Sequence, residues 1–225
     1  LARRLAEHLN LPFLDTGLLY RAVAHVMLKQ HLAWSDVQGA VRAAEGLIIE
    51  HIEAAHLRDE SIALGASKVA AVPTVRAALL ALQRNFMAKG CGAILAGRDI
   101  GTVVCPDASY KIFVTASVEE RARRRWREMH RDGEARGYDK LVQELRERDR
   151  RDVERVVAPM LIASDAWVLD TTHLNESGAF TEVCQYISNA RPQGVNSNKG
   201  TKRDTGGQRS SSFRPGSLSE PGACR

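Results

Sequence analysis

The chain has 225 residues, of which 44% are hydrophobic, 5% aromatic and 26% charged, a composition typical of an α/β protein with one substantial core. It contains no run of eighteen apolar residues, begins with an amphipathic helical pattern rather than a signal peptide, and scatters its four cysteines without CxxC spacing, so we expect a cytoplasmic protein that binds no membrane. The formal net charge of +5 comes from residues 191–225, which hold seven Lys or Arg and two Asp or Glu, whereas the other residues hold 25 of each sign. Net charge therefore does not indicate nucleic-acid binding by the folded part.

Short apolar runs alternate with long helical patterns along the first 190 residues. Such alternation predicts a parallel sheet joined by crossover helices. The helical spacing from residue 67 to residue 89 is interrupted by Pro73, which predicts two helices or one kinked helix. The predicted strands lie at residues 11–14, 93–96, 111–114 and 166–170.

The C-terminal half of the chain contains two further segments of unusual composition. Residues 117–150 are highly charged and predict a helical hairpin with a link around Gly133 and Gly137. From residue 191 the chain is rich in Gly, Ser, Pro and charge, and cannot bury enough apolar surface to offset the entropy of ordering. We therefore divide the chain into a domain at 1–190 and a disordered tail at 191–225.

Polar residues follow the first two predicted strands. After residues 11–14 come Asp15, Thr16 and Gly17, and Arg21 lies one turn into the next helix, so one of the first two can cap that helix. This motif alone favours capping over chemistry. Because ligands bind at the carboxyl ends of parallel strands, the motif is nevertheless a candidate binding segment.

After residues 93–96 the sequence reads Gly97-Arg98-Asp99-Ile100-Gly101-Thr102. Here Arg98 can bind a phosphate and Asp99 can accept from the amino group of a base. The alternative is a local ion pair between the two within a turn, and the residues alone do not decide between these readings.

A third charged motif follows the hairpin. On a helix Arg148, Asp152 and Arg155 fall on one face, which alone indicates a solvated charge stripe. Combined with the two strand-end motifs, it supplies arginines from three segments. Phosphoryl transfer requires such fixed positive groups around the transferring phosphate.

In order and spacing, the motifs DTGxxYR, SKVAAxPxVR, AGRDIGTVVxPDA, KIFxTAS, EERARRR and ERDxRDxxRxVAP resemble the bacterial cytidylate kinases. The resemblance covers about residues 1–190. It implies a P-loop-type nucleoside monophosphate kinase, in which a parallel sheet is flanked by helices. The implied reaction transfers the γ-phosphoryl group of ATP, with Mg²⁺, to CMP or dCMP in pyrimidine nucleotide metabolism.

The same resemblance assigns roles to matching positions. The implied cytosine contacts are Thr16, Ser67, Arg76 and Asp99. The α-phosphate of the acceptor would be held by Arg21, Arg98 and Arg155, which thereby act in catalysis, and its sugar by Arg148 and Asp152. Residues of about 35–66 would form the acceptor-binding insert and about 120–150 a lid over ATP, with candidate phosphate contacts at Arg121, Arg124 and Arg125.

The chain departs from the family pattern in two places. The family's first strand and its GxxxxGK[ST]-type loop, which bind the ATP phosphates, do not precede the first helix of this sequence. We therefore expect a gap in the middle of the sheet and a chain that is inactive or poorly folded alone. The stretch at 41–62 is short, so the family's sheet extension there would be replaced by helix. No protein metal site and no oligomer are indicated, and a monomer is the expectation.

Three alternatives remain. A related kinase for UMP or shikimate would require another motif in place of GRDIG, which Ser67, Arg76 and Asp99 together argue against. A nucleic-acid-binding protein would require interleaved aromatic residues, of which the basic run offers only Trp126. A nucleotide-binding pseudoenzyme fragment is the third, and only the codons upstream of Leu1 would distinguish it.

Overall fold

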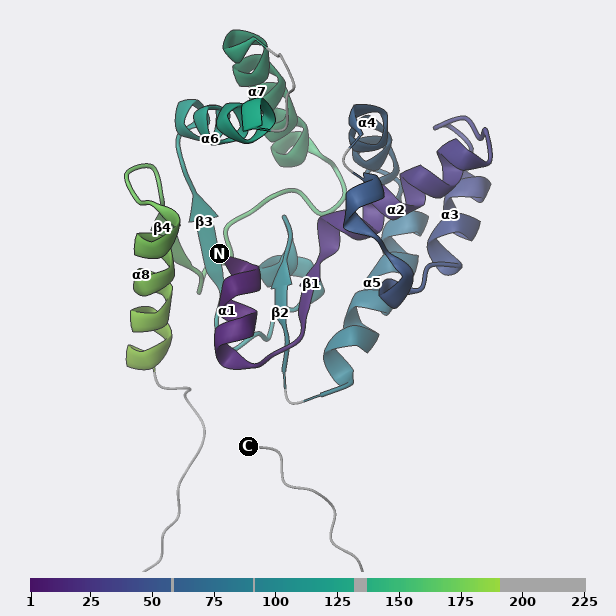
Figure 1. The fold of residues 1–225 in the computed structure, drawn as a ribbon. Helices are drawn as coiled ribbons and strands as arrows, with labels where there is room; N and C mark the ends of the chain where they lie inside the picture. Colours follow the sequence, from purple (N-terminus) through teal and green to yellow (C-terminus); the bar gives the residue numbers. More distant parts are fainter. Residues whose placement is uncertain (58, 91, 132–136, 191–225) are drawn as a thin grey trace, which may run out of the picture.

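The computed structural model describes residues 1–57, 59–90, 92–131 and 137–190 (Figure 1). Four short strands alternate with helices, as the sequence predicts. The strands are β1 Phe13–Asp15, β2 Ile94–Ala96, β3 Ile112–Thr115 and β4 Trp167–Asp170. The helices are α1 Ala2–Leu9, α2 Thr16–Lys29, α3 Val37–Glu45, α4 Glu60–Val69, α5 Pro73–Ala88, α6 Val118–Arg131, α7 Tyr138–Glu154 and α8 Glu176–Asn189, with short turns of helix at η1 Ile49–His51, η2 Ala54–Leu57 and the π-helical η3 Ile100–Val104.

The strands pair in parallel, which confirms that part of the sequence prediction. Strand β1 pairs with β2, placing Leu14 opposite Leu95, and β3 pairs with β4, placing Val114 opposite Leu169. Each pair is a separate two-stranded sheet within the described residues. Helix α1 connects them, because Leu5 lies in a hydrophobic cluster with residues of β2, β3 and β4.

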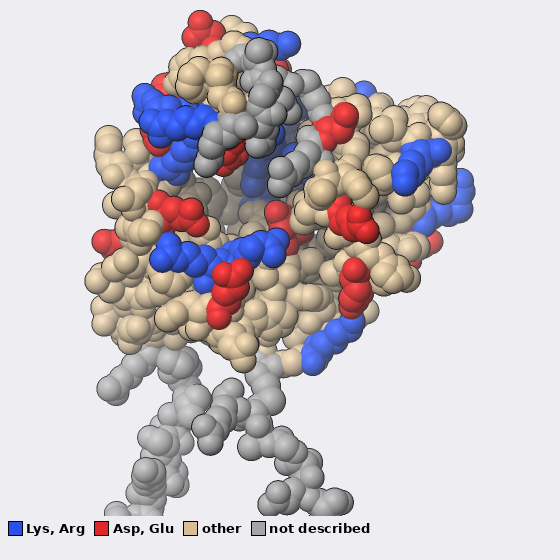
Figure 2. All heavy atoms as spheres, in the orientation of Figure 1, with Lys and Arg blue, Asp and Glu red and all other residues tan. Residues whose placement is uncertain are grey.

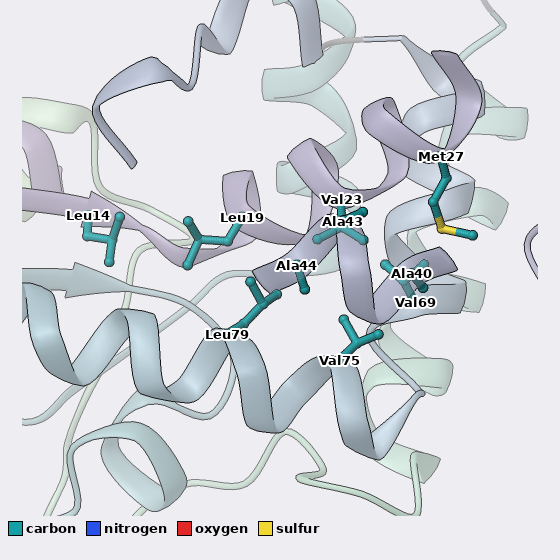
Figure 3. Packing of buried hydrophobic residues seen from close by; sticks show 10 residues of the cluster. All are labelled: Leu14, Leu19, Val23, Met27, Ala40, Ala43, Ala44, Val69, Val75 and Leu79. Carbon is teal, nitrogen blue, oxygen red and sulfur yellow. The ribbon is translucent and has the colours of Figure 1, made fainter. Parts of the chain in front are cut away.

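The main hydrophobic core lies among α2, α3, α4 and α5 on one side of β1 (Figure 3). Figure 3 shows side chains from these helices directed toward a common interior. Three of them, Leu19, Val23 and Met27, follow one another at four-residue spacing on α2 and are fully buried. Each such side chain contributes roughly 1.5–3 kcal/mol by leaving water. This core fixes α2 and α5, which carry the polar residues described below.

Local signals set the helix boundaries. The Asp15 carboxylate accepts from the Gly17 N–H at 2.9 Å and so caps α2. Pro73 occupies the first turn of α5, where its missing N–H costs nothing, and this confirms the predicted break. In the described part of the chain no single helix is long and apolar enough to cross a membrane, and the α4–α5 pair, which is long enough together, is bent by 95°.

The predicted acceptor-binding insert, at about residues 35–66, contains helix where the family pattern implies an extension of the sheet. Helix α3, the turns η1 and η2, and the start of α4 occupy residues 35–57 and 59–66, and no strand occurs in these described residues. The expected replacement of the family's sheet extension by helix is confirmed there.

Helices α6 and α7 form the expected helical hairpin, seen as a separate lobe at the top of Figure 1. The hairpin has a hydrophobic cluster of its own, centred on Ala122, Met129 and Leu141. The predicted link at Gly133 and the predicted tail at 191–225 lie outside the described residues. Because the hairpin has a hydrophobic core of its own, it can keep its shape if its position relative to the body changes.

Candidate phosphate- and base-binding site

A cleft of about 1430 Å³ separates the lid hairpin from the helical body. Its walls come from α2, η2 and α4 on one side and from α6 and α7 on the other. Four of the residues predicted for the site line it, namely Arg21, Ser67, Arg125 and Arg148. Residues of α2, η2 and α4 therefore face residues of α6 and α7 across one space.

Three of the four predicted base-recognition residues, Thr16, Arg76 and Asp99, form a buried group at the ends of β1 and β2, whereas Ser67 lines the cleft. Asp15 and Ala96 are in register, so the residues that follow them, Thr16 and Asp99, are brought close together. The Thr16 hydroxyl donates to the Ala96 carbonyl at 2.9 Å, which joins the two strand ends. Thr16 and Asp99 are 3% and 6% exposed, so neither lies open in the cleft.

Arg76 reaches Asp99 from the first turns of α5. Its Nη2 atom donates to Oδ2 of Asp99, and its Nη1 atom donates to the Ala70 carbonyl at 3.3 Å. Both side chains of the ion pair are nearly buried, at 9% and 7% exposure. Because a buried ion pair is costly to desolvate, its retention beside a cleft indicates a role beyond stability.

Gly97 permits this close arrangement. A Cβ atom there would collide with Oγ1 of Thr16 and would lie 2.7 Å from Cδ1 of Ile100. The glycine between Ala96 and Arg98 is thus required by packing against Thr16. Backbone and side chains meet here at a spacing that only glycine allows.

Three arginines at or near the cleft have pKa values below the ordinary value of arginine. Arg21 donates to the Leu57 carbonyl at 2.7 Å, and its pKa is lowered by burial and then by Arg125. The pKa of Arg148 is lowered by burial and then by Arg98, and that of Arg155 by burial and then by Arg76. Burial is the largest cause of each shift, and the arginine named second adds to it, so several guanidinium groups lie close enough to act on one another.

The GRD segment makes long-range ion pairs, so the alternative of a local pair is wrong. Arg98 donates through Nε to Asp152 at 2.9 Å, while Asp99 pairs with Arg76. The side chains of Arg98 and Asp99 therefore point in different directions, and each pairs with a residue on a different helix. Arg98 thereby connects the end of β2 to the end of α7.

One detail of the third motif needs correction. Helix α7 ends at Glu154, so Arg155 is its C-cap residue and does not continue the helical face of Arg148 and Asp152. Its guanidinium donates twice to the Ala158 carbonyl, at 3.1 and 2.5 Å. The chain turns there, because Ala158 has a positive φ of 49°. This turn directs Arg155 toward Arg76 and Asp99.

The three lid arginines differ in their contacts. Arg121 binds both carboxylate oxygens of Asp149, at 2.9 and 2.5 Å. Arg124 donates to the Thr171 carbonyl at 2.5 Å and to the Leu174 carbonyl at 3.2 Å, so it fastens the lid to the loop after β4. Only Arg125 of the three lines the cleft, where it lies 3.4 Å from Glu128.

Sequence reasoning missed two residues near the site. Tyr20 carries a ring 5.6 Å from Cζ of Arg76, and Arg3 of α1 lines the cleft. The tyrosine was visible within the DTGxxYR motif, immediately before Arg21, and its position was the available signal. Arg3 had no such signal, because its helix reads as an ordinary amphipathic one.

Charge on the surface is mixed. On the face shown in Figure 2, Lys and Arg lie among Asp and Glu rather than in a patch of one sign. The ion pairs of the lid, such as that between Arg146 and Glu119 at 2.9 Å, show the same interspersion. Among the described residues no group of three or more His, Cys, Asp or Glu could hold a metal ion.

Parallel strand pairs with arginines after β1 and β2, and a helical lobe across a cleft from them, define an α/β protein with a candidate site at the strand ends. The family model described as cytidylate kinase matches residues 1–189. Among the curated relatives, "Cytidylate kinase" of Methylocella silvestris is 50% identical over 190 residues, covering 84% of this chain and 88% of the relative. "Cytidylate kinase" of Paramagnetospirillum magneticum is 50% identical over 194 residues, covering 85% and 92%. That of Bartonella henselae is 44% identical over 187 residues, covering 83% and 87%. The chain belongs to the cytidylate kinase family, and so to the nucleotide-binding kinases.

Proposed function

We propose that this protein transfers the γ-phosphoryl group of ATP to CMP or dCMP, giving CDP or dCDP. The observation that carries the proposal is the buried pair of Arg76 and Asp99 beside a cleft lined with arginines. Cytosine offers an exocyclic amino donor next to ring acceptors. A carboxylate beside a guanidinium is complementary to that arrangement.

The phosphate of the acceptor would lie between the body and the lid. Arg21 and Arg148 line the cleft, and Arg98 and Arg155 lie within the same cluster of charges. Arginine side chains are not deprotonated in proteins, so these groups are cationic near neutral pH. Fixed positive groups of this kind stabilise charge that develops during phosphoryl transfer without reorganising at the moment of reaction. Asp152, which accepts from Arg98, would also accept from a sugar hydroxyl.

Recognition of the base would involve four side chains with different exposure. Ser67 lines the cleft from α4, whereas Thr16, Arg76 and Asp99 lie beneath its surface. The base must therefore enter past the cleft surface to reach Asp99. Because Arg76 binds the Oδ2 atom of Asp99, the Oδ1 atom offers the acceptor for the cytosine amino group.

For ATP, we propose that a strand and a glycine-rich phosphate loop belong immediately upstream of α1. The two strand pairs are separate, and α1 packs against both through Leu5. Val114 of β3 and Val168 of β4 are 48% and 46% exposed, although strand residues in an α/β sheet are ordinarily covered. A further strand beside β3 would satisfy the open backbone edge.

Mg²⁺ would enter with the ATP phosphates. The described residues hold no ready-made ligand cluster, and a cation with a strong preference for phosphate oxygens and water does not need one. Arg125, directed into the cleft, is the lid residue best placed to meet the donor phosphates. Arg121 would do so after leaving Asp149.

The test is a coupled kinase assay with ATP and, in turn, CMP, dCMP, UMP and shikimate. It is run on this chain and on a protein extended upstream to the next in-frame start codon. We expect turnover of CMP and dCMP by the extended protein only. Activity of this chain alone would refute the need for an upstream loop, and an extended protein that folds yet phosphorylates none of the four would refute the kinase function.

A further inference from the structure

We infer that Tyr20 is a positioning residue for base recognition, whose ring holds the guanidinium of Arg76 in the orientation that presents Asp99 to cytosine. The inference rests on the proposed function and adds a residue to it. Tyr20 does not line the cleft, so its effect on the substrate would pass through Arg76. Three features of the structure support this role.

The first is the geometry around Arg76. Its guanidinium is held by the Asp99 carboxylate, by the Ala70 carbonyl at 3.3 Å and by the Tyr20 ring, whose centroid lies 5.6 Å from Cζ. These partners come from the segment after β2, from the end of α4 and from α2. Loss of the ring would leave two hydrogen-bonding partners on a side chain with several rotatable bonds. The ring therefore restricts the rotamer of Arg76 and leaves the charge of that side chain unchanged.

The second feature is the position of Tyr20 itself. It follows Leu19, which is fully buried, and precedes Arg21, which reaches the cleft. The ring packs against two parts of the hydrophobic core, which fixes it from behind. A rigid ring on a well-anchored helix is a suitable support, because it has few degrees of freedom to lose.

The third feature is the electrostatic surroundings. Arg76, Asp99 and Arg155 all act on the Tyr20 hydroxyl, and burial raises the pKa of Tyr20 above its ordinary value. The phenol therefore stays neutral at the pH of any assay near 7. A neutral ring attracts a cation through its π-face, and this attraction strengthens when water is excluded. Removing only the hydroxyl should leave that attraction in place.

The experiment compares Tyr20→Phe and Tyr20→Leu in the extended protein. Because Tyr20→Phe keeps the ring, we expect its KM for CMP to stay within about twofold of the wild type. Tyr20→Leu removes the π-face, and we expect its KM for CMP to rise roughly tenfold, a factor equivalent to about 1.4 kcal/mol. The KM for ATP should not change, and kcat should change much less than the KM for CMP.

Tyr186→Leu is the matched control. Tyr186 is also half-buried and aromatic, and it stacks on Trp167 of β4 with centroids 4.4 Å apart, on α8. Its replacement should lower the melting temperature without raising the KM for CMP. If Tyr20→Leu does not fold, Tyr20→Met provides an unbranched, flexible side chain that adapts to the space while still removing the ring, and the same KM increase is expected.

The outcomes separate the inference from the proposed function. Wild-type protein that does not phosphorylate CMP overturns the function itself. Active wild-type protein with an unchanged KM for CMP in Tyr20→Leu overturns only the role of Tyr20. An equal loss in Tyr20→Phe would also overturn it, because the hydroxyl rather than the ring would then be responsible. A tenfold increase in Tyr20→Leu alone supports it.

Discussion

The body and the lid of this protein both use ion pairs, but in different environments. In the body, Arg76 and Asp99 are 9% and 7% exposed, and each has its partner fixed by a helix or a strand end. In the lid, Arg146 and Glu119 are 61% and 53% exposed, and Arg121 and Asp149 are 33% and 29% exposed. The first kind is shielded from water and salt, whereas the second is open to both.

The difference corresponds to what each region has to do. A buried pair gains strong Coulomb attraction but loses hydration, so it fixes geometry at a cost in stability. Exposed pairs contribute little and can exchange partners. Under the proposed function, a base-recognition group would benefit from fixed geometry, and a lid that opens and closes would benefit from pairs that are easily replaced.

The largest expected effect comes from Asp99→Asn in the extended protein. The variant leaves the Arg76 charge buried without its counter-charge, and removing one partner of a buried pair costs roughly 3–5 kcal/mol of stability. It also removes the carboxylate proposed to accept from cytosine. The value of kcat/KM for CMP should fall by well over tenfold, or more than about 1.4 kcal/mol. Steady-state kinetics and urea unfolding measure the two effects.

Asp165→Asn is the control for this change. Asp165 is an exposed aspartate that pairs with Lys111 at 2.6 Å, just before β4 and thus at the opposite end of the strands from the site. Its kcat/KM for CMP should remain near that of the wild type. An unchanged kcat/KM in Asp99→Asn would remove Asp99 from the site.

An intermediate effect is expected from Gly97→Ala, which tests whether tight packing supports the buried pair. The added methyl group would collide with Thr16 and Ile100. Overpacking of this kind costs roughly 1–3 kcal/mol, and displacement of Thr16 should also raise the KM for CMP. Thermal unfolding and kinetics provide the readouts. Gly90→Ala is the matched control, since nothing lies within 4 Å of a Cβ atom there, and it should be neutral or slightly stabilising.

Much of the fold could be predicted from local sequence. The four apolar runs became strands because each is short, apolar and followed by a helix that can cover it. Pro73 ended one helix and began another because proline has no N–H to donate and fits only in a first turn. Such signals lie within a few residues of the element they determine.

The candidate site could be predicted only in part. Arg98 and Asp99 are neighbours in sequence, yet their partners are Asp152 and Arg76, which lie 54 and 23 residues away. Residue types indicated that an arginine and a carboxylate were needed, but not which arginine meets which carboxylate. Partner choice depends on how α5 and α7 dock against the strand ends.

The contacts of the three lid arginines could not be predicted from the sequence either. Arg121, Arg124 and Arg125 are indistinguishable by type and lie within five positions of one another. Their directions differ by the helical rotation, so one binds Asp149, one binds the loop after β4 and one lines the cleft. A shift of one residue in the start of α6 would have exchanged these environments.

The smallest expected effect comes from Asp149→Asn, which tests whether the lid pair is exchangeable. Arg121 and Asp149 are partly exposed, so loss of the charge should reduce the free energy of unfolding by no more than about 1 kcal/mol. The reduction should shrink as salt is added, because screening weakens the pair in the wild type as well. Arg121 is then released from its bidentate partner, and the KM for ATP should fall while the KM for CMP stays constant. Glu147→Gln, on the same helix and exposed, controls for a general change in lid charge. A large, salt-independent loss of stability would show that the lid pair behaves like the buried pair of the body, and the distinction between the two regions would then be wrong.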